Sequence, residues 1–168
     1  NQLIQDLLTY SRVNTEPFER ETINVEELLS EVQENLKGSI EETGAQISLK
    51  NLPKEIQGSA VRLQQLFQNL LSNAIKFHQP EQAPEIKIAA KETATHWSFT
   101  VADNGIGIDP EFHDQVFVIF KKLHNNQTYQ GTGIGLALVK RIVAQHDGDI
   151  WLESALDQGT QIHFTLRK

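Results

Sequence analysis

Apolar residues of this chain recur at helical spacing, on one side of the helix that they predict, in four segments. These segments are residues 3–12, 25–43, 60–77 and 134–146. Asn24 is a good N-cap for the second segment, Glu26 and Glu27 stand in its first turn, and Gly44 follows its end. The first segment predicts a partner surface, because an isolated helix of roughly 12 residues is marginal in water.

Shorter stretches alternate apolar and polar positions, as half-buried strands do. They are residues 45–49, 85–91, 97–102, 150–154 and 161–166, of which the last two predict a closing hairpin. A short extended piece around residues 54–57 is expected to pair with the first strand. Asp109 and Pro110 predict a short helix, and residues 117–130 predict irregular structure. Because regular strand–helix–strand alternation is missing, the pattern predicts an α+β fold, a two-layer α/β sandwich with helices on one face of the sheet.

The length of 168 residues suits one domain, which we place at residues 24–168. Residues 1–15 are expected to be a helical remnant, and residues 16–23, which include Pro17, are expected to be a linker. The first residue already lies inside a helical pattern, so we interpret the chain as a piece of a longer protein. No apolar run approaches the roughly 18 residues that a bilayer span needs, and no membrane segment is expected in this chain.

Composition narrows the possible partners. The formal net charge of -7 argues against nucleic acid, because no basic surplus offsets phosphate repulsion. Cysteine is absent, which excludes disulfides and a thiolate metal site. The six histidines show no short-range ligand spacing, and we interpret them as ordinary core or surface residues.

A polar stripe follows one edge of the apolar face of the third helix. Asn69, Asn73 and Lys76 stand at i, i+4 and i+7, within an arc of about 60°. Amide oxygens suit Mg²⁺ that is shared with substrate phosphates, and a lysine neutralises a phosphate oxygen. The alternative interpretation is a solvated polar edge.

The first glycine-spaced loop reads Asp103-Asn-Gly-Ile-Gly-Ile-Asp109 and follows a predicted strand. A carboxylate at the end of that strand could accept a hydrogen bond from the exocyclic amine of adenine, which would select adenine over guanine. A hairpin turn is the alternative, because Asp-Asn-Gly is also a turn signal. A turn alone does not account for Gly107 and Asp109.

The next segment, residues 116–124, is apolar and then doubly basic. Phe117 and Phe120 could anchor a lid, while Lys121 and Lys122 face phosphates. Irregular segments of more than about 12 residues are usually functional or disordered, which favours a lid. A loop packed by the two phenylalanines is the alternative.

The second glycine-spaced loop runs from Gly131 through Gly133 and Gly135 into the last helix. Exposed backbone N–H groups and the positive end of the helix dipole make it a plausible phosphate cradle. A flexible hinge followed by a helix start would give the same pattern.

Taken together, these motifs resemble the catalytic ATP-binding region of sensor histidine kinases, in the superfamily shared with gyrase, Hsp90 and MutL. The resemblance covers about residues 24–168 and is carried by four motifs, at residues 69–77, 103–109, 116–124 and 131–137. It implies a Bergerat-type fold with a mixed sheet of about five strands, covered on one face by about three helices. Residues 3–12 resemble the end of the second helix of the family's dimerisation hairpin. Together with residues 117–124 and 150–151, they are most similar to the phytochrome-like branch.

The resemblance implies roles at the metal and phosphate end of the site. Asn73 would be the Mg²⁺ ligand, and Asn69 would support the metal or the phosphates. Lys76 and Lys122 would contact phosphates. Lys122 stands where many relatives have arginine, so a bidentate fork is replaced by a point charge.

The resemblance also implies the residues around the rest of the nucleotide. Asp103 would read the adenine amine, and Gly105 and Gly107 would shape the base pocket. The remaining residues that it implies are Phe77, Ile108, Phe120, Lys121, Gly131, Thr132, Gly133, Ile134, Gly135 and Leu136.

The expected activity is therefore transfer of the γ-phosphate of ATP, with Mg²⁺, to a histidine on a dimerisation domain absent from this chain. Its six histidines do not stand in an acceptor-like context. A response regulator would receive the phosphoryl group from that domain, the parent would be a homodimer, and the chain would be cytoplasmic. One alternative is a gyrase- or MutL-type ATPase, which places a general-base glutamate where this chain has Asn69, an amide that cannot accept a proton. The other is an interaction module of the same fold that has lost its nucleotide.

Overall fold

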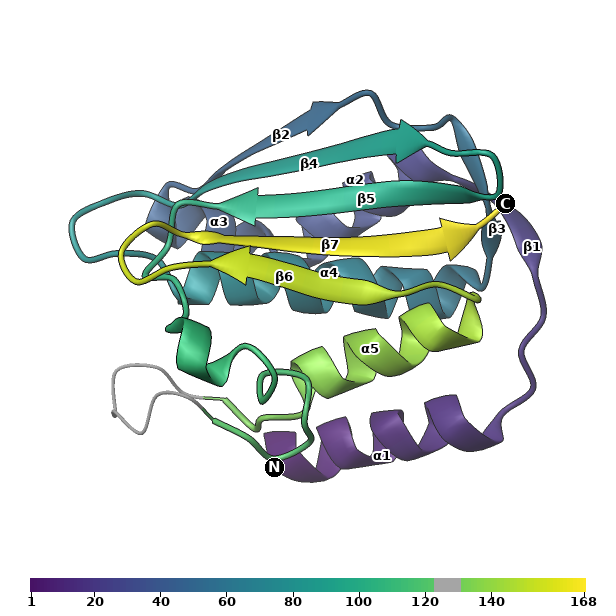
Figure 1. The fold of residues 1–168 in the computed structure, drawn as a ribbon, viewed down its shortest axis with the longest axis horizontal. Helices are drawn as coiled ribbons and strands as arrows, with labels where there is room; N and C mark the ends of the chain where they lie inside the picture. The colour runs from purple at the N-terminus through teal and green to yellow at the C-terminus, as the bar shows by residue number, and fades with distance from the viewer. Residues whose placement is uncertain (123–130) are drawn as a thin grey trace.

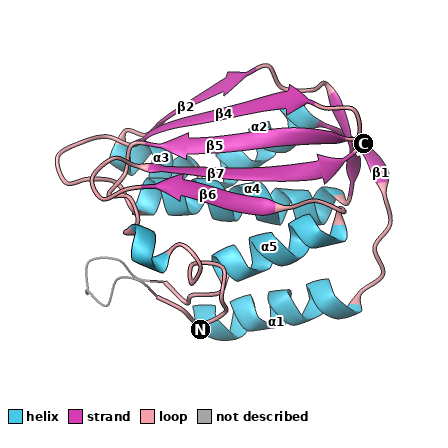
Figure 2. Cartoon of the chain, viewed as in Figure 1, coloured by secondary structure: helices cyan, strands magenta, loops and turns pink. Residues whose placement is uncertain are grey.

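Five strands form a mixed sheet, and helices cover one of its faces (Figure 1, Figure 2). The computed structural model describes residues 1–122 and 131–168. The strands of this sheet are β2 (Gln46–Lys50), β4 (Glu85–Glu92), β5 (His96–Asp103), β6 (Ile150–Ser154) and β7 (Thr160–Arg167). Their order is β2-β4-β5-β7-β6, with β2 parallel to β4 and the other neighbours antiparallel. The predicted two-layer α+β fold is confirmed.

The helical layer is built around α4 (Ala60–Lys76), which lies between α2 (Val25–Asn35) and α5 (Gly135–Gln145). Ser59 caps the start of α4 with its hydroxyl, and Phe77 follows its last turn. One side of α4 is apolar and fully buried, which is why a helix forms here and packs against the sheet. A short 3-10 helix, Pro110–Phe112, follows the loop after β5, as predicted for Asp109 and Pro110.

Three phenylalanines join the two layers. Phe99 of β5 and Phe164 of β7 are register partners whose rings stack with centroids 5.3 Å apart. Phe67 of α4 meets both rings edge-on, at 5.8 Å and 5.7 Å. All three side chains are completely buried, and such pairs contribute about 0.5–1.5 kcal/mol beyond their area burial.

The single helix expected over residues 25–43 is wrong. The backbone turns out of the helical conformation at Leu36 (φ -101°, ψ 7°), and α3 (Lys37–Thr43) begins after it. Leu36 is buried, and Gly38, a weak helix former, stands in the first turn of α3. Apolar residues keep the same spacing on both sides of the break, so the pattern alone does not reveal it.

The pairing expected between residues 45–49 and 54–57 is also wrong. β2 instead joins β4, and β3 (Glu55–Gly58) pairs with β1 (Glu21–Asn24) in a separate two-stranded sheet. The residues of β1 fall mostly within the segment expected as a linker. This ribbon ties that segment to the residues that lead into α4.

The first helix, α1 (Gln2–Thr15), runs alongside α5 at the edge of the molecule (Figure 1). Its buried residue is Val13. The apolar residues that predicted a partner surface remain exposed; they are Leu3, Ile4, Leu7 and Leu8. The part of the chain that the structure describes does not cover this face.

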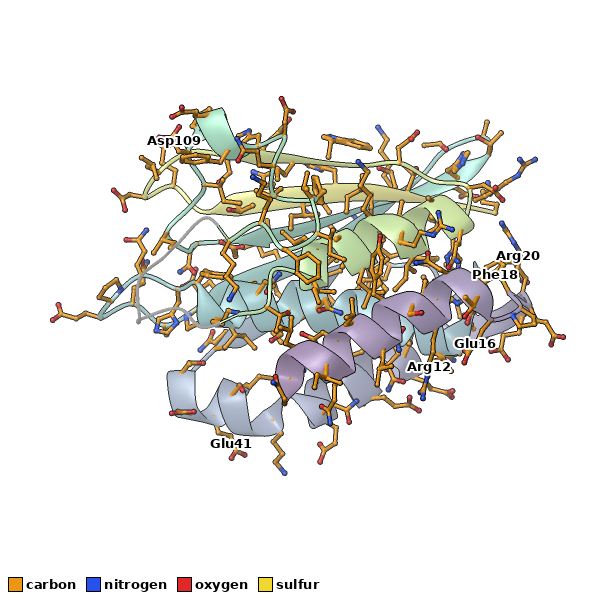
Figure 3. The ribbon with its side chains drawn as sticks, turned by 90° about the horizontal axis from the view of Figure 1, so that it is seen from below. Arg12, Glu16, Phe18, Arg20, Glu41 and Asp109 are labelled. Atoms are coloured by element: carbon orange, nitrogen blue, oxygen red, sulfur yellow. The ribbon has the colours of Figure 1, made fainter. Side chains whose placement is uncertain are left out.

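Residues after α1 are held against α4 and α5 by a group that we call the linker cluster: Glu16, Phe18, Arg62, Gln145 and His146. Figure 3 labels Glu16 and Phe18 beyond the end of α1. The Phe18 ring meets the His146 ring edge-on at 4.7 Å, and the guanidinium of Arg62 lies 5.1 Å from the Phe18 centroid. Arg62 also donates to the carbonyl of Glu16 (2.9 Å) and to Oε1 of Gln145 (3.0 Å).

Within residues 1–122 and 131–168, the helices are too short or too polar to cross a membrane.

Candidate functional site

A cavity of about 640 Å³ opens between α4, the start of α5 and the adjoining ends of β5 and β7. Small-molecule sites usually measure roughly 300–1,000 Å³. Most of the predicted site residues line it: Asn69, Asn73, Lys76, Phe77, Asp103, Gly107, Ile108, Lys121, Lys122, Gly131, Thr132, Gly133, Ile134, Gly135 and Leu136. Segments far apart in the sequence therefore meet around one space.

Asp103 stands at one end of the cavity, as the last residue of β5. Its Oδ1 accepts the N–H groups of Gly105 (2.9 Å) and Thr160 (3.2 Å). Burial raises the pKa of Asp103, and these two hydrogen bonds act in the opposite direction. Within the described residues the hydrogen bonds to this carboxylate all reach Oδ1, which leaves Oδ2 for a ligand.

The loop after Asp103 packs tightly against neighbouring backbone. Ile106 donates its N–H to the carbonyl of Phe77 at 2.9 Å, which joins the loop to the end of α4. Gly107 has φ +71°, and a Cβ there would lie 1.9 Å from the carbonyl oxygen of Ala155. Glycine is therefore required at this position, and the loop holds Asp103 and α4 in a fixed relation.

Two asparagines of α4 face the start of α5. Asn69 donates from Nδ2 to the carbonyl of Gln65 at 2.8 Å, which turns its Oδ1 toward Gly135. A Cβ on Gly135 would lie 2.9 Å from that oxygen and 4.0 Å from Nδ2 of Asn73. The amides and the N-terminus of α5 therefore border the same part of the cavity. Such a terminus attracts anions.

Lysines make this end of the cavity positive. Burial lowers the pKa of Lys76, the carboxylate of Asp6 raises it, and the nearby charge of Lys122 lowers it further. The ammonium of Lys76 lies 4.8 Å from the ring centroid of Phe77. An anion bound here would relieve the repulsion between the two lysines. The cavity thus has a carboxylate at one end and cations at the other.

Two predicted residues do not line the cavity. A Cβ on Gly105 would lie 2.4 Å from the Phe77 carbonyl, so this glycine permits the packing of the loop without reaching the space itself. The side chain of Phe120 is exposed, and its N–H donates to the carbonyl of Gly133 at 2.8 Å. This backbone hydrogen bond joins the segment that contains Phe120 to the second glycine-spaced loop. The motif residues 123 and 124 lie outside the described part of the chain.

Several residues of the site lie outside the predicted motifs. Gln65 lines the cavity, and its buried Oε1 lacks a hydrogen-bond partner among the described residues. Its position one helical turn before Asn69 is a signal that would have indicated it. Gln2, Asp6 and Thr9 of α1 also line the cavity, and no local pattern connects them with it.

The donors present fit a hard cation shared with phosphates. Groups of three or more His, Cys, Asp or Glu side chains that could hold a metal are absent from residues 1–122 and 131–168. The oxygen donors near the lysines include the amide side chains of Asn69, Asn73 and Gln65. Mg²⁺ with few protein ligands keeps several waters and binds substrate phosphates, which suits this set.

The geometry agrees with a comparison against known families. The model of the family described as "Histidine kinase-, DNA gyrase B-, and HSP90-like ATPase" matches residues 58–168. The chain belongs to this family. The matched region contains α4, both glycine-spaced loops and all the strands from β4 to β7, and so includes every predicted site residue.

Curated relatives include phytochrome and phytochrome-like proteins. The chain is 48% identical over 164 residues to cyanobacterial phytochrome A of Nostoc sp., which covers 98% of the chain and 21% of that protein. It is 43% identical over 164 residues to the phytochrome-like protein Cph1 of Synechocystis sp., covering 98% of the chain and 22% of that protein. The chain spans about a fifth of the length of these relatives. The predicted likeness to the phytochrome-like branch is confirmed.

Solved histidine kinases share the fold. Full-length ShkA in complex with AMPPNP matches with a TM-score of 0.82 and 27% identity, over 98% of this chain and 35% of that chain. The match includes nearly all of this member of the ATPase family, and it extends into α1.

Proposed function

We propose that this chain is the ATP- and Mg²⁺-binding catalytic domain of a sensor histidine kinase. One observation carries the proposal: a single cavity holds the partly buried carboxylate of Asp103 at one end and α4 amides with lysines at the other. Membership of the ATPase family and the likeness to AMPPNP-bound ShkA support it.

Each end of the cavity would bind one part of ATP. Asp103 would accept a hydrogen bond from the adenine amine through Oδ2, while Gly105 and Thr160 hold the carboxylate in place. Lys76 and Lys122 would neutralise phosphate oxygens. The backbone N–H groups at the start of α5 would add a further positive field.

Asn73, with Asn69 beside it, would hold Mg²⁺ through amide oxygens. The ion supplies charge neutralisation at the transferred phosphoryl group when it is bound. The protein's own task is to position the triphosphate and exclude water, because phosphoryl transfer depends mainly on orientation and electrostatics.

The acceptor would be a histidine imidazole on a dimerisation domain of the same kinase. The P–O bond to ADP breaks as the P–N bond to histidine forms, and a receiver domain of a response regulator takes the phosphoryl group next. On this proposal the parent protein is a homodimer, and the chain works in the cytoplasm. Water activation of the gyrase kind is disfavoured, since the amide of Asn69 is not a general base.

Calorimetric titration with AMPPNP tests the nucleotide site. We expect wild-type binding in Mg²⁺, and a loss of about tenfold or more for Asn73→Ala, because a metal ligand has been removed. In EDTA the two proteins should differ by less than about threefold. An equal loss in EDTA contradicts the ligand assignment, and absence of binding by the wild type favours the interaction module.

Transfer needs a separate experiment. The chain, ATP and Mg²⁺ are mixed with a separately produced dimerisation domain, and acid-labile, base-stable phosphate on that domain is measured. Phosphohistidine is expected. Rapid ATP hydrolysis without phosphohistidine would instead support an ATPase.

A further inference from the structure

Asp6 of α1 reaches across to the second glycine-spaced loop. Its Oδ2 accepts the hydroxyl hydrogen of Thr132 at 2.6 Å, and its Oδ1 accepts from Nε2 of Gln2 at 2.6 Å. Both Asp6 and Thr132 line the cavity. The hydroxyl of Thr132, at the phosphate end of the proposed ATP site, thus already donates its hydrogen bond to a carboxylate of α1.

The charge of Asp6 lies close enough to Lys76 to act on it. Its carboxylate acts on the ammonium of Lys76, which also feels Lys122. Among the described residues that line the cavity, Asp6 and Asp103 are the carboxylates, and of these two Asp6 is the one whose charge acts on Lys76. Asp6 therefore supplies the negative charge at the lysine end.

We propose that Asp6 is a specificity-determining residue that stands in for a phosphate group, so that ATP must displace its carboxylate from Thr132 and from the neighbourhood of Lys76. The inference rests on the proposed nucleotide function. A carboxylate and a phosphate oxygen are both anionic acceptors, and they compete for the same donors. Asp6 should therefore weaken binding more strongly as the ligand carries more phosphate charge.

The structure allows this displacement without unfolding the domain. The residues that anchor α1 lie at its other end, where Val13 is buried and its carbonyl accepts from Nε2 of Gln145. The half of α1 that carries Asp6 is held mainly by polar contacts, and its apolar residues are exposed. By linkage, nucleotide affinity and the docking of α1 on the loop must then influence each other.

The test uses the full 168-residue chain and the substitution Asp6→Asn. Asparagine keeps an oxygen acceptor for Thr132 but removes the charge. Glu41→Gln is the matched control, because it removes one negative charge from the exposed side of α3 (Figure 3). Adenosine, ADP and AMPPNP are titrated into each protein with Mg²⁺ at low and high salt.

For Asp6→Asn we expect AMPPNP affinity to rise about threefold to tenfold, ADP affinity to rise less, and adenosine affinity to stay within about twofold. The gain should shrink at high salt, because screening weakens exposed charge effects. Glu41→Gln should match the wild type with all three ligands.

Three outcomes would overturn the inference: an unchanged AMPPNP-to-adenosine affinity ratio, a weaker AMPPNP affinity, or an equal gain in the Glu41→Gln protein. Each of these leaves the proposed function standing, since nucleotide still binds. If neither the wild type nor either variant binds any of the three ligands, the proposed function fails with it.

Discussion

At the scale of single residues, Asp103 combines a cost to stability with its proposed role in binding the base. Its carboxylate is largely removed from water, and this burial raises its pKa despite two backbone hydrogen bonds. The folded state then binds the proton more tightly than the unfolded chain does. The stability that Asp103 contributes through this proton is present below its ordinary pKa of 3.8. It is lost as the pH rises through the higher pKa that Asp103 has in the folded state.

The substitution Asp103→Asn should separate these two effects. Asparagine keeps an oxygen for the N–H groups of Gly105 and Thr160, so the melting temperature at pH 7 should stay the same or rise. AMPPNP affinity should fall at least about tenfold, because a charge-assisted hydrogen bond to the base is lost. Thermal melting and calorimetry measure the two quantities, with the exposed Asp114→Asn as control. A large drop in melting temperature would refute the explanation.

His146 is a second residue whose environment controls its protonation. Its ring is buried; Nε2 accepts the N–H of Ser59 at 3.1 Å, and Nδ1 faces the carbonyl of Ile142 at 2.8 Å. Burial lowers the pKa of His146; the Ile142 carbonyl raises it, Arg20 and Arg62 lower it, and Asp147 raises it. The neutral ring, with its hydrogen on Nδ1, satisfies both hydrogen bonds.

Stability should therefore fall in mild acid. The unfolded chain takes up the proton as pH falls through about 6.5, while folded His146 resists it until a lower pH. Between these values the free energy of unfolding should decrease by up to about 1.4 kcal/mol per pH unit from this group. Urea unfolding at pH 7.5 and 5.5 measures the decrease, and His146→Gln should reduce it. Identical pH dependence in both proteins would exclude His146 as the source.

At the scale of elements, the linker cluster connects three separate segments. Arg62 is nearly inaccessible to solvent and sits in the first turn of α4. Its guanidinium reaches Glu16 after α1 and Gln145 at the end of α5, and it lies over Phe18. A planar fork with several donors can make these contacts together, which a lysine cannot.

Arg62→Ala should consequently lower the free energy of unfolding by about 2–3 kcal/mol, since two part-buried hydrogen bonds and the packing of the buried side chain are lost. It should also speed proteolytic cleavage near residues 16–20. Arg62→Lys is expected to be intermediate, and Arg12→Ala, at an exposed position of α1, should change stability by less than about 0.5 kcal/mol. Urea unfolding and limited proteolysis provide the measurements. Equal effects of Arg12→Ala and Arg62→Ala would show that the cluster does not hold the segment.

At the scale of the whole molecule, the sequence predicts most of the layered fold, because each element has its own periodicity. Strands β4 to β7 and helices α4 and α5 follow from alternation or helical spacing that is local to each segment. The partner of β3 does not follow, since pairing with β1 joins residues more than thirty positions apart. The break between α2 and α3 at Leu36 is not predicted, because the apolar spacing continues through it.

The same distinction applies to the site. Asp103, Asn69, Asn73 and the glycines stand in short motifs, so their types and spacing are enough to indicate a common cavity. Asp6 stands in an ordinary helical segment, and its contact with Thr132 spans 126 positions of sequence. Only the folded arrangement brings these two side chains together.

Two residues through which α1 contacts the rest of the molecule, Asp6 and Val13, lie on the same side of the helix. Asp6 and Val13 are about two turns apart, so both side chains face the body of the molecule while that spacing holds. One added residue between them would rotate Asp6 by about 100° away from Thr132, with Val13 still seated. Contact between the Asp6 carboxylate and Thr132 therefore depends on how many residues separate Asp6 from the anchored end of α1.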